Sequence, residues 1–244
     1  MAAGEPRYFS AGSFKFLRAL ARNNRRDWFQ AHKEDYEALV KTPALRLIAD
    51  LAQPLKRLSP QLVADPRPVG GSLFRIYRDT RFAKDKTPYK THAGMTFFHA
   101  ATRRAARGLA GTAALGRLDA PVLYLHLEPG ECFMGGGIWH PQPPTLKRIR
   151  DFISDNPSSW QAATRSRSFS RHYALTGESL TRPPRGYNPA HKLIEDLKRT
   201  DFVASSALSD RELLRADLPR RLIERYRVLR PMLEWQCLAL NLEF

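Results

Sequence analysis

The chain has 244 residues, and its 40 lysines and arginines outnumber its 24 acidic residues, giving a formal net charge of +16. The two cysteines, Cys132 and Cys237, are too few for a disulfide framework and lack the paired spacing of a zinc or redox motif, which excludes a disulfide-rich secreted protein. No apolar run approaches the roughly 20 residues that span a bilayer, and the first residues lack the features of a signal peptide, so we expect a cytoplasmic protein without a membrane partner.

The first part of the chain, residues 10–58, is predicted to be helical. Its apolar residues recur at helical spacing after a candidate N-cap at Ser10 or Ser13. A second helix is expected after this one. Thr42 followed by Pro43 is typical of an N-cap and a first helical position, so a third helix is predicted to begin there.

A sheet-rich section is predicted over residues 72–140. It begins with an alternating pattern that would place Phe74 and Ile76 on one face of a strand and Arg75 and Tyr77 on the other. Because the strand candidates follow one another without intervening helices, an antiparallel sheet is favoured over a doubly wound parallel one. The further strand candidates are residues 94–99, 122–127 and 131–138.

Two other regions complete the predicted domain. Residues 100–120, rich in Ala, Arg and Gly, are expected to form an exposed, mobile loop. Residues 143–244 are expected to hold helices and short strands, with Asp217 as a cap of the last helix and Pro231 as a kink or restart in it. The predicted fold is one α+β domain over residues 1–244, with an antiparallel sheet of about five or more strands packed against N-terminal and C-terminal helices. The oligomeric state does not follow from the sequence.

The most informative segment for function is residues 73–90, where cations are concentrated. Such charges repel one another unless anions lie among them, and arginine suits phosphate or carboxylate through bidentate contacts. Two alternatives remain open: the arginines pair with Asp79, Asp85 and acids elsewhere in a buried network, or they lie on a solvated face of the sheet. The aromatic residues between the cations could stack nucleic-acid bases or belong to the core. The predicted ligand-binding residues of the segment are Arg75, Arg78, Arg81, Lys86, Tyr89 and Lys90.

A second candidate is the run of Gly135, Gly136 and Gly137, whose amides could approach a ligand closely. A bulge in a strand would explain these glycines equally well. The run matches neither a Walker A loop nor a dinucleotide fingerprint. The weak candidates for catalysis are Asp79, as an orienting group or acid/base, and His140, as a general base beside the glycines.

The seven histidines are scattered along the sequence without the spacing of a metal motif, so neither a metal site nor a cofactor is predicted. His126 would share a strand face with Val122 and Tyr124. We interpret it as a hydrogen-bonded histidine of the sheet rather than as a ligand.

Four groups of residues match the pattern of one family: Asn23-Asn24 with Trp28-Phe29, residues 74–82 and 84–90, Gly135–Gly137 with Pro141, and residues 146–153. In these groups the chain resembles the bacterial and fungal family catalogued as domain of unknown function 2461. The resemblance covers most of the chain, from about residue 9 to the last helices, and implies no established activity, cofactor or partner. Residues 100–120 form a longer connection than is usual for that family.

The function that the sequence favours is binding of a phosphate-bearing or other anionic small molecule, and whether the protein is an enzyme is left open. A nucleic-acid-binding module is the first alternative, because of the net positive charge and the aromatics within the basic segment. A protein-interaction scaffold is the second, and an exposed apolar stripe on the last helix would favour it.

Overall fold

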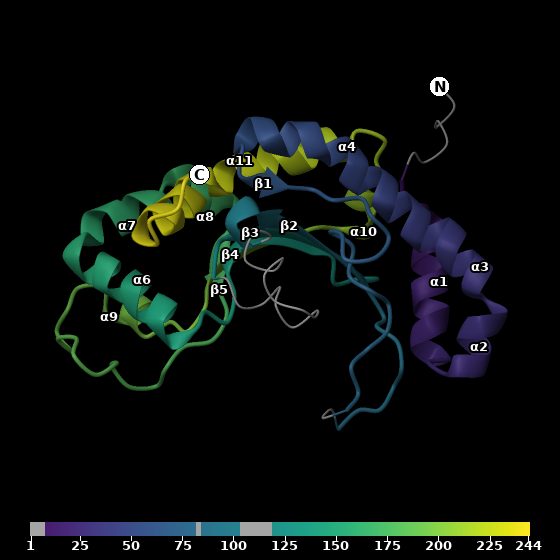
Figure 1. Cartoon of the computed structure of the whole chain (residues 1–244), viewed down its shortest axis with the longest axis horizontal. Coiled ribbons are helices and arrows are strands. Elements are labelled where there is room, and N and C mark those ends of the chain that lie inside the picture. The colour runs from purple at the N-terminus through teal and green to yellow at the C-terminus, as the bar shows by residue number, and fades with distance from the viewer. Residues whose placement is uncertain (1–7, 82–83, 103–118) are drawn as a thin grey trace.

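The computed structural model describes residues 8–81, 84–102 and 119–244. Within these residues the central element is a six-stranded sheet with the order β1-β2-β3-β4-β6-β5, in which every pair of neighbours is antiparallel (Figure 1). The predicted α+β class and antiparallel sheet are therefore confirmed. The strands are β1 (Leu62–Val63), β2 (Ala93–His99), β3 (Val122–Leu127), β4 (Phe133–Ile138), β5 (Ala174–Thr176) and β6 (Phe202–Ala207).

Helices lie before and after the main strands in the chain, as predicted. The N-terminal group is α1 (Ala11–Arg22), α2 (Arg26–Ala31), α3 (Lys33–Tyr36), the π-helical turn η1 (Glu37–Lys41) and α4 (Thr42–Leu58). The later helices are α6 (Pro143–Asp155), α7 (Pro157–Thr164), α8 (Arg167–His172), α9 (Ile194–Leu197), α10 (Asp210–Leu213) and α11 (Leu218–Ala239). None of the described helices combines the length and apolar character needed to cross a membrane.

Local sequence explains how the N-terminal helices begin. Ser10 and Ser13 form a capping box at the start of α1, in which the Ser10 amide donates to Ser13 Oγ at 2.9 Å. Thr42, by contrast, is not a cap, because η1 leads directly into α4 and the residue before Thr42 is already helical. Pro43 is tolerated there because the first turn of an α-helix does not need its amide hydrogen.

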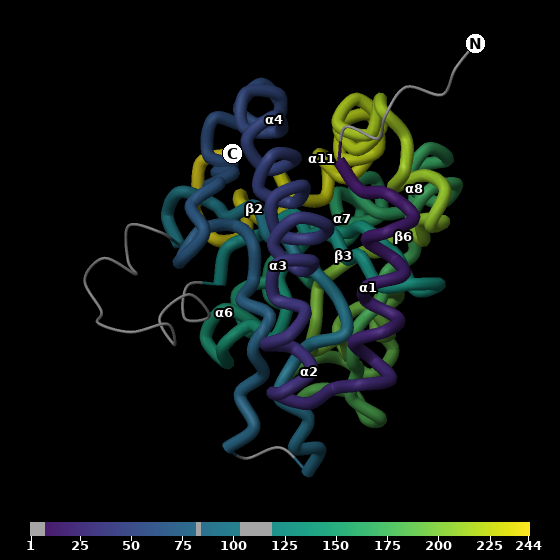
Figure 2. The backbone as a smooth tube through the Cα atoms, turned by 90° about the vertical axis from the view of Figure 1, so that its right-hand side faces the viewer, coloured from purple at the N-terminus to yellow at the C-terminus, as the bar shows by residue number. Residues whose placement is uncertain are grey.

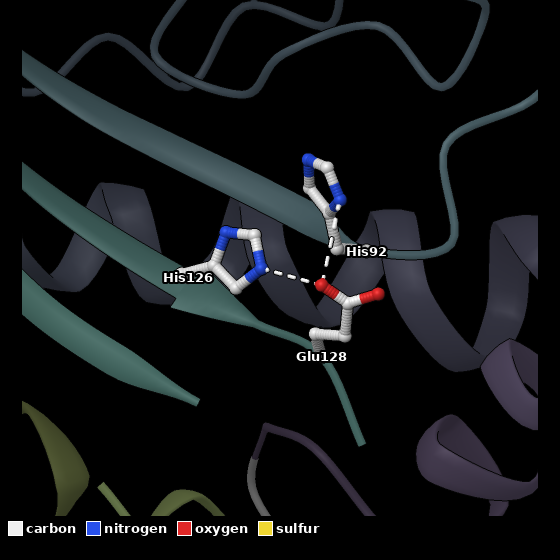
Figure 3. A group of neighbouring side chains, drawn as sticks. All are labelled: His92, His126 and Glu128. Carbon is white, nitrogen blue, oxygen red and sulfur yellow. Dashed lines mark hydrogen bonds and ion pairs between the residues drawn. The ribbon is translucent and has the colours of Figure 1, made fainter. Parts of the chain in front are cut away.

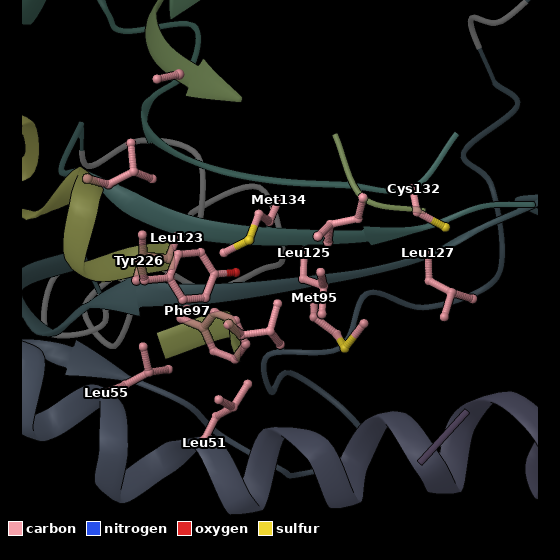
Figure 4. Close-up of a cluster of buried hydrophobic side chains, with 14 of the residues drawn as sticks. Leu51, Leu55, Met95, Phe97, Leu123, Leu125, Leu127, Cys132, Met134 and Tyr226 are labelled. Carbon is pink, nitrogen blue, oxygen red and sulfur yellow. The ribbon is translucent and has the colours of Figure 1, made fainter. Parts of the chain in front are cut away.

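The core lies between one face of the sheet and the helices α4 and α11 (Figure 1). On β3, the fully buried Leu123 and Leu125 alternate with Tyr124 and His126, which point to the opposite face. Figure 4 shows this packing, with Leu51 and Leu55 of α4, Tyr226 of α11 and the leucines of β3 in one cluster. Burial of each such side chain contributes about 1.5–3 kcal/mol.

The three glycines lie inside β4 rather than in a bulge, because each pairs with one residue of β3 and one of β6. A Cβ on Gly137, whose φ is +126°, would lie 2.1 Å from the carbonyl oxygen of Phe202. At Gly135 a Cβ would lie 2.5 Å from the carbonyl oxygen of Ala204. The glycines therefore allow β4 and β6 to pair closely at the centre of the sheet.

The alternating segment that begins at residue 72 does not form the predicted strand. Only isolated bridges occur there, between Leu73 and Met95 and between Tyr77 and Tyr89. The two described arms, residues 73–81 and 84–90, lie side by side and extend away from α4 and α11 (Figure 1), and we call them the basic hairpin. Because the segment leaves the sheet, its alternation does not predict burial: Ile76 is buried, whereas Phe74, on the same predicted face, is 40% exposed.

Two further predictions have mixed outcomes. Most of the loop predicted over residues 100–120 lies outside the described residues, and residues 100–102 have helical conformation.

The last helix, α11, runs continuously through Pro231 and does not restart there. Asp217 does occupy its N-cap position, although its side chain makes no capping hydrogen bond.

Candidate functional site

The basic hairpin is fastened to the N-terminal helices near its second arm, beside α2 (Figure 2). The Asn24 side chain donates to the carbonyl oxygen of Tyr89 at 2.9 Å and accepts from the Tyr89 amide at 3.1 Å. The Tyr89 ring is buried and stacks on Phe29, with 4.1 Å between ring centroids. This anchoring fixes where the neighbouring cations and Thr91 lie relative to the sheet.

Part of the charge of the hairpin is balanced internally. Arg78 Nη1 contacts both Asp85 and Thr87, and Arg81 pairs with Asp79 at 2.7 Å. Hydrogen bonds from Arg81 lower the pKa of Asp79 to about 2. The amide of Thr87 and then the guanidinium of Arg78 lower the pKa of Asp85 to about 2. Arg78 and Arg81 thus pair with Asp85 and Asp79, as one alternative proposed, but these pairs are exposed to solvent and do not form a buried network.

The other cations of the hairpin are not balanced in this way. Lys86 Nζ donates to the carbonyl oxygen of Thr80 at 2.9 Å, and Lys90 Nζ lies over the Phe74 ring, 5.1 Å from its centroid. Burial, and then the charge of Arg75, lower the pKa of Lys90. Among the described residues, neither Arg75 nor Lys90 has a carboxylate within 4 Å. Neither cation therefore forms an ion pair with a described residue, although the charge of Arg75 helps to lower the pKa of Asp79.

A cavity of about 350 Å³ opens between the basic hairpin and the start of β2. We call it the hairpin pocket. Among the predicted site residues it brings together Arg78, Asp79, Tyr89 and Lys90, whereas Arg75, Arg81 and Lys86 do not line it. Its full lining is Arg78, Asp79, Tyr89, Lys90, Thr91 and His92.

At the edge of the hairpin pocket, His92 belongs to a cluster with His126 and Glu128, which we call the His-His-Glu cluster (Figure 3). Glu128 Oε2 lies 2.9 Å from His126 Nε2 and 3.8 Å from His92 Nδ1. The two imidazole rings lie 4.3 Å apart, and His126 also stacks on Phe133 at 4.7 Å. The cluster offers two imidazole nitrogens and a carboxylate, which are donor groups that can bind a transition metal.

The surroundings of the cluster favour neutral imidazole at His92. Burial, and then the proximity of His126, lower the pKa of His92 to about 4, with Lys90 and Arg78 acting in the same direction. Partial burial raises the pKa of Glu128, but hydrogen bonds from His126 and Thr91 outweigh that effect and leave the pKa below its usual value. At neutral pH the cluster therefore presents a neutral His92 ring beside an ionised carboxylate.

Sequence reasoning missed this cluster, although part of its signal was present. His126 and Glu128 are two residues apart, as expected for neighbours on one side of an extended strand. The missing information was the register of β2 against β3. Ala93 pairs with Leu127, which places His92 opposite Glu128.

The remaining predicted site residues lie elsewhere. Gly135, Gly136 and Gly137 pack against the backbone or side chains of neighbouring elements, and none lines the hairpin pocket. His140, which also does not line the pocket, has a φ of 51° and binds Asp201: its amide donates at 2.6 Å and its Nδ1 lies 3.1 Å away, both from Oδ1. The structure gives His140 a contact with a buried carboxylate.

A second cavity, of about 210 Å³, lies among α8, α10 and α11. Its arginines already have acidic partners: Arg225 pairs with Glu212 at 2.7 Å, and Arg221 with Asp217 at 3.1 Å.

On α11, whose residues are all described, Leu238 is the one large apolar side chain that is exposed, so the helix carries no apolar stripe. Neither feature competes with the hairpin pocket as a binding site for an anion.

Comparison with known protein families gives one result for the whole chain. A family model described as "Conserved hypothetical protein (DUF2461)" matches residues 12–235. No curated protein matches the sequence. The match confirms the family resemblance that the hairpin and glycine segments suggested, and its description names no activity.

Proposed function

The chain belongs to the DUF2461 family of conserved hypothetical proteins, and from that premise we propose that the hairpin pocket binds a phosphate-bearing or other anionic small molecule. The observation that carries the proposal is the position of Lys90, which is partly buried at the pocket and has no carboxylate partner among the described residues. Partial burial of an ammonium group without an anion costs free energy, and a bound anion would offset that cost.

Arg78 supports the same conclusion. Both of its hydrogen bonds to described residues come from Nη1, so the other donors of its guanidinium are available toward the pocket that it lines. Asp85 and Thr87 hold the guanidinium in place, which reduces the entropy lost when a ligand binds. A phosphate or carboxylate group suits such a preorganised fork.

A thermal-shift titration tests the proposal. Inorganic phosphate, sugar phosphates and nucleotides are added to the full chain in the presence of EDTA, which keeps divalent metals out of the measurement. A ligand at about 100 times its Kd should stabilise the protein by about 2.7 kcal/mol. The proposal is wrong if none of these anions raises the unfolding temperature of the wild type.

A matched pair of variants locates the site. Lys90→Gln and Lys147→Gln each remove one positive charge, but Lys147 lies on α6 and pairs with Asp151. Lys90→Gln should lose most of the ligand-induced shift, and Lys147→Gln should keep it. Equal losses in both variants would indicate attraction by net charge alone, which contradicts a specific pocket.

Nucleic-acid binding is the second candidate, and it is favoured by the exposure of aromatic rings on the hairpin. Phe74 is 40% exposed and Tyr77 is 47% exposed, beside the cations of the same segment. Exposed rings in basic surroundings can stack unpaired bases. If single strands bind, log K should fall with log salt by about 0.7 for each neutralised phosphate, and Tyr77→Ala should weaken binding.

A further inference from the structure

The His-His-Glu cluster joins the start of β2 to the end of β3, two adjacent strands of the sheet (Figure 3). His92 precedes β2 by one residue, His126 lies in β3, and Glu128 follows β3. Their side chains meet on the face of the sheet opposite α4 and α11. Because antiparallel pairing sets the positions of all three, their approach does not depend on a long connecting loop.

The spacing of the donor atoms suits one small ion. In a tetrahedral site with metal–ligand bonds of about 2.1 Å, ligand atoms lie about 3.4 Å apart. Glu128 Oε2 lies 2.9 Å from His126 Nε2 and 3.8 Å from His92 Nδ1, and all three ligand atoms lie within 4.8 Å of one another. Small side-chain rotations would bring these atoms into a metal's coordination shell.

The outer partners of the cluster are those of a metal site. In the hydrogen bond to Glu128 the proton of His126 is on Nε2, so an ion that binds there requires the other tautomer, with the proton on Nδ1. The Tyr124 hydroxyl lies 3.0 Å from Nδ1 and can accept that Nδ1–H. The Thr91 hydroxyl donates to Glu128 Oε1 at 2.7 Å, so the carboxylate is held by one oxygen and offers the other, Oε2. Ligating histidines and carboxylates in proteins are typically oriented by such hydrogen bonds.

From this geometry we propose that His92 Nδ1, His126 Nε2 and Glu128 Oε2 bind a divalent transition-metal ion of the zinc class. Two imidazoles and one carboxylate are a ligand set suited to zinc and to other first-row metals, and unsuited to calcium or magnesium, which prefer oxygen. Three protein ligands leave a coordination position for water or a ligand group, as in catalytic zinc sites.

The charges around the cluster link the metal to the hairpin pocket. Two neutral imidazoles and one carboxylate balance only half the charge of a divalent ion. The positive charges of Lys90 and Arg78 lie close enough to lower the pKa of His92, so they would also repel a bound metal ion. An anion in the pocket would reduce the repulsion between these cations and the metal. The metal proposal rests on the cluster geometry and stands independently of the proposed function.

Metal binding by the full chain tests the proposal. The protein is treated with EDTA, freed of chelator, and dialysed against Zn²⁺ or Co²⁺, and bound metal is measured by elemental analysis and by the visible spectrum of Co²⁺. The wild type should bind one ion per chain. His92→Asn and Glu128→Gln, which change partly exposed side chains, should weaken binding by at least roughly 100-fold, because loss of an outer partner alone costs 10–100-fold.

Two further variants sharpen the result. His172→Asn removes an exposed histidine of α8, away from the cluster, and should leave metal affinity unchanged. Tyr124→Phe removes the hydroxyl beside His126 Nδ1 but no ligand, and should weaken binding by roughly 10–100-fold. Far-UV circular dichroism verifies that each variant is folded.

The outcomes separate the two proposals of this structure. Absence of metal binding, or equal affinity in the wild type, His92→Asn and Glu128→Gln, would overturn the metal site and leave a hydrogen-bonded trio of polar side chains. Phosphate binding in EDTA depends on Lys90 and needs no ion, so it can succeed or fail independently. Loss of metal binding in His172→Asn as well would indicate nonspecific binding to surface histidines and would also overturn the site.

Discussion

The side-chain amide of Asn24 pairs with both backbone polar groups of Tyr89, as a neighbouring β-strand would. The two residues are 65 positions apart in sequence. Asn24 lies in the short connection between α1 and α2, so this pair joins the first helices to the second arm of the basic hairpin. Lys90 and Thr91 follow directly, and the pair therefore helps to position the lining of the hairpin pocket.

Replacement of Asn24 should destabilise the protein. Asn24→Ala leaves the amide and carbonyl of Tyr89 without these partners in a part-buried environment, at a cost of about 1–3 kcal/mol. Asn23→Ala is the control, because the Asn23 side chain makes one local hydrogen bond, to the Ala19 carbonyl oxygen. Urea denaturation should show a clearly larger loss for Asn24→Ala, and equal losses would show that the pairing with Tyr89 adds nothing specific.

Gly94 makes room for the tyrosine that contacts His126. A Cβ at Gly94 would lie 2.5 Å from the Tyr124 hydroxyl oxygen and 3.0 Å from the Phe74 ring. Gly94→Ala should therefore displace Tyr124 and cost about 1–3 kcal/mol through overpacking.

A double-mutant cycle isolates this contact. Tyr124→Phe removes the hydroxyl that the new methyl group would meet, so Gly94→Ala should cost less in the Tyr124→Phe background than in the wild type. The free energies of unfolding of the four proteins give the coupling. Additive losses would mean that the conflict lies with Phe74 instead.

Both thiols should be unreactive in the folded protein. Burial raises the pKa of Cys132 to about 12 and that of Cys237 to about 12. Since a free thiol has a pKa of about 8.5, the thiolate fraction at pH 8 should fall by roughly 10³-fold on folding. A chromogenic disulfide reagent should therefore label both cysteines rapidly in urea and very slowly without it. Rapid labelling of either thiol in the native protein would contradict this burial.

The sequence predicted the elements whose patterns are local. The capping serines of α1 and the strand ranges 94–99 and 122–127 agree closely with the structure. The segment after residue 72 was wrong as a strand because its alternation of aromatic and charged residues belongs to a hairpin that leaves the sheet. Periodicity identifies extended backbone but does not show whether a neighbouring strand pairs with it.

The candidate site was only partly predictable for a related reason. Charge density indicated the hairpin, and Arg78 and Lys90 do line its pocket. Which cations form ion pairs and which line the pocket depends on side-chain distances within the hairpin, and these distances do not follow from the sequence. The His-His-Glu cluster depends on strand register, which links residues 34 and 36 positions apart and leaves no contiguous motif.

The alternation along β3 also has a consequence for folding. Shifting β3 by one residue would turn His126 and Glu128 toward α4 and α11 and would expose Leu123, Leu125 and Leu127 to water. An ionised glutamate in that apolar layer would be prohibitively costly. The alternation of polar and apolar side chains on β3 thus disfavours a shifted strand register during folding, whether or not the polar side chains ever hold an ion.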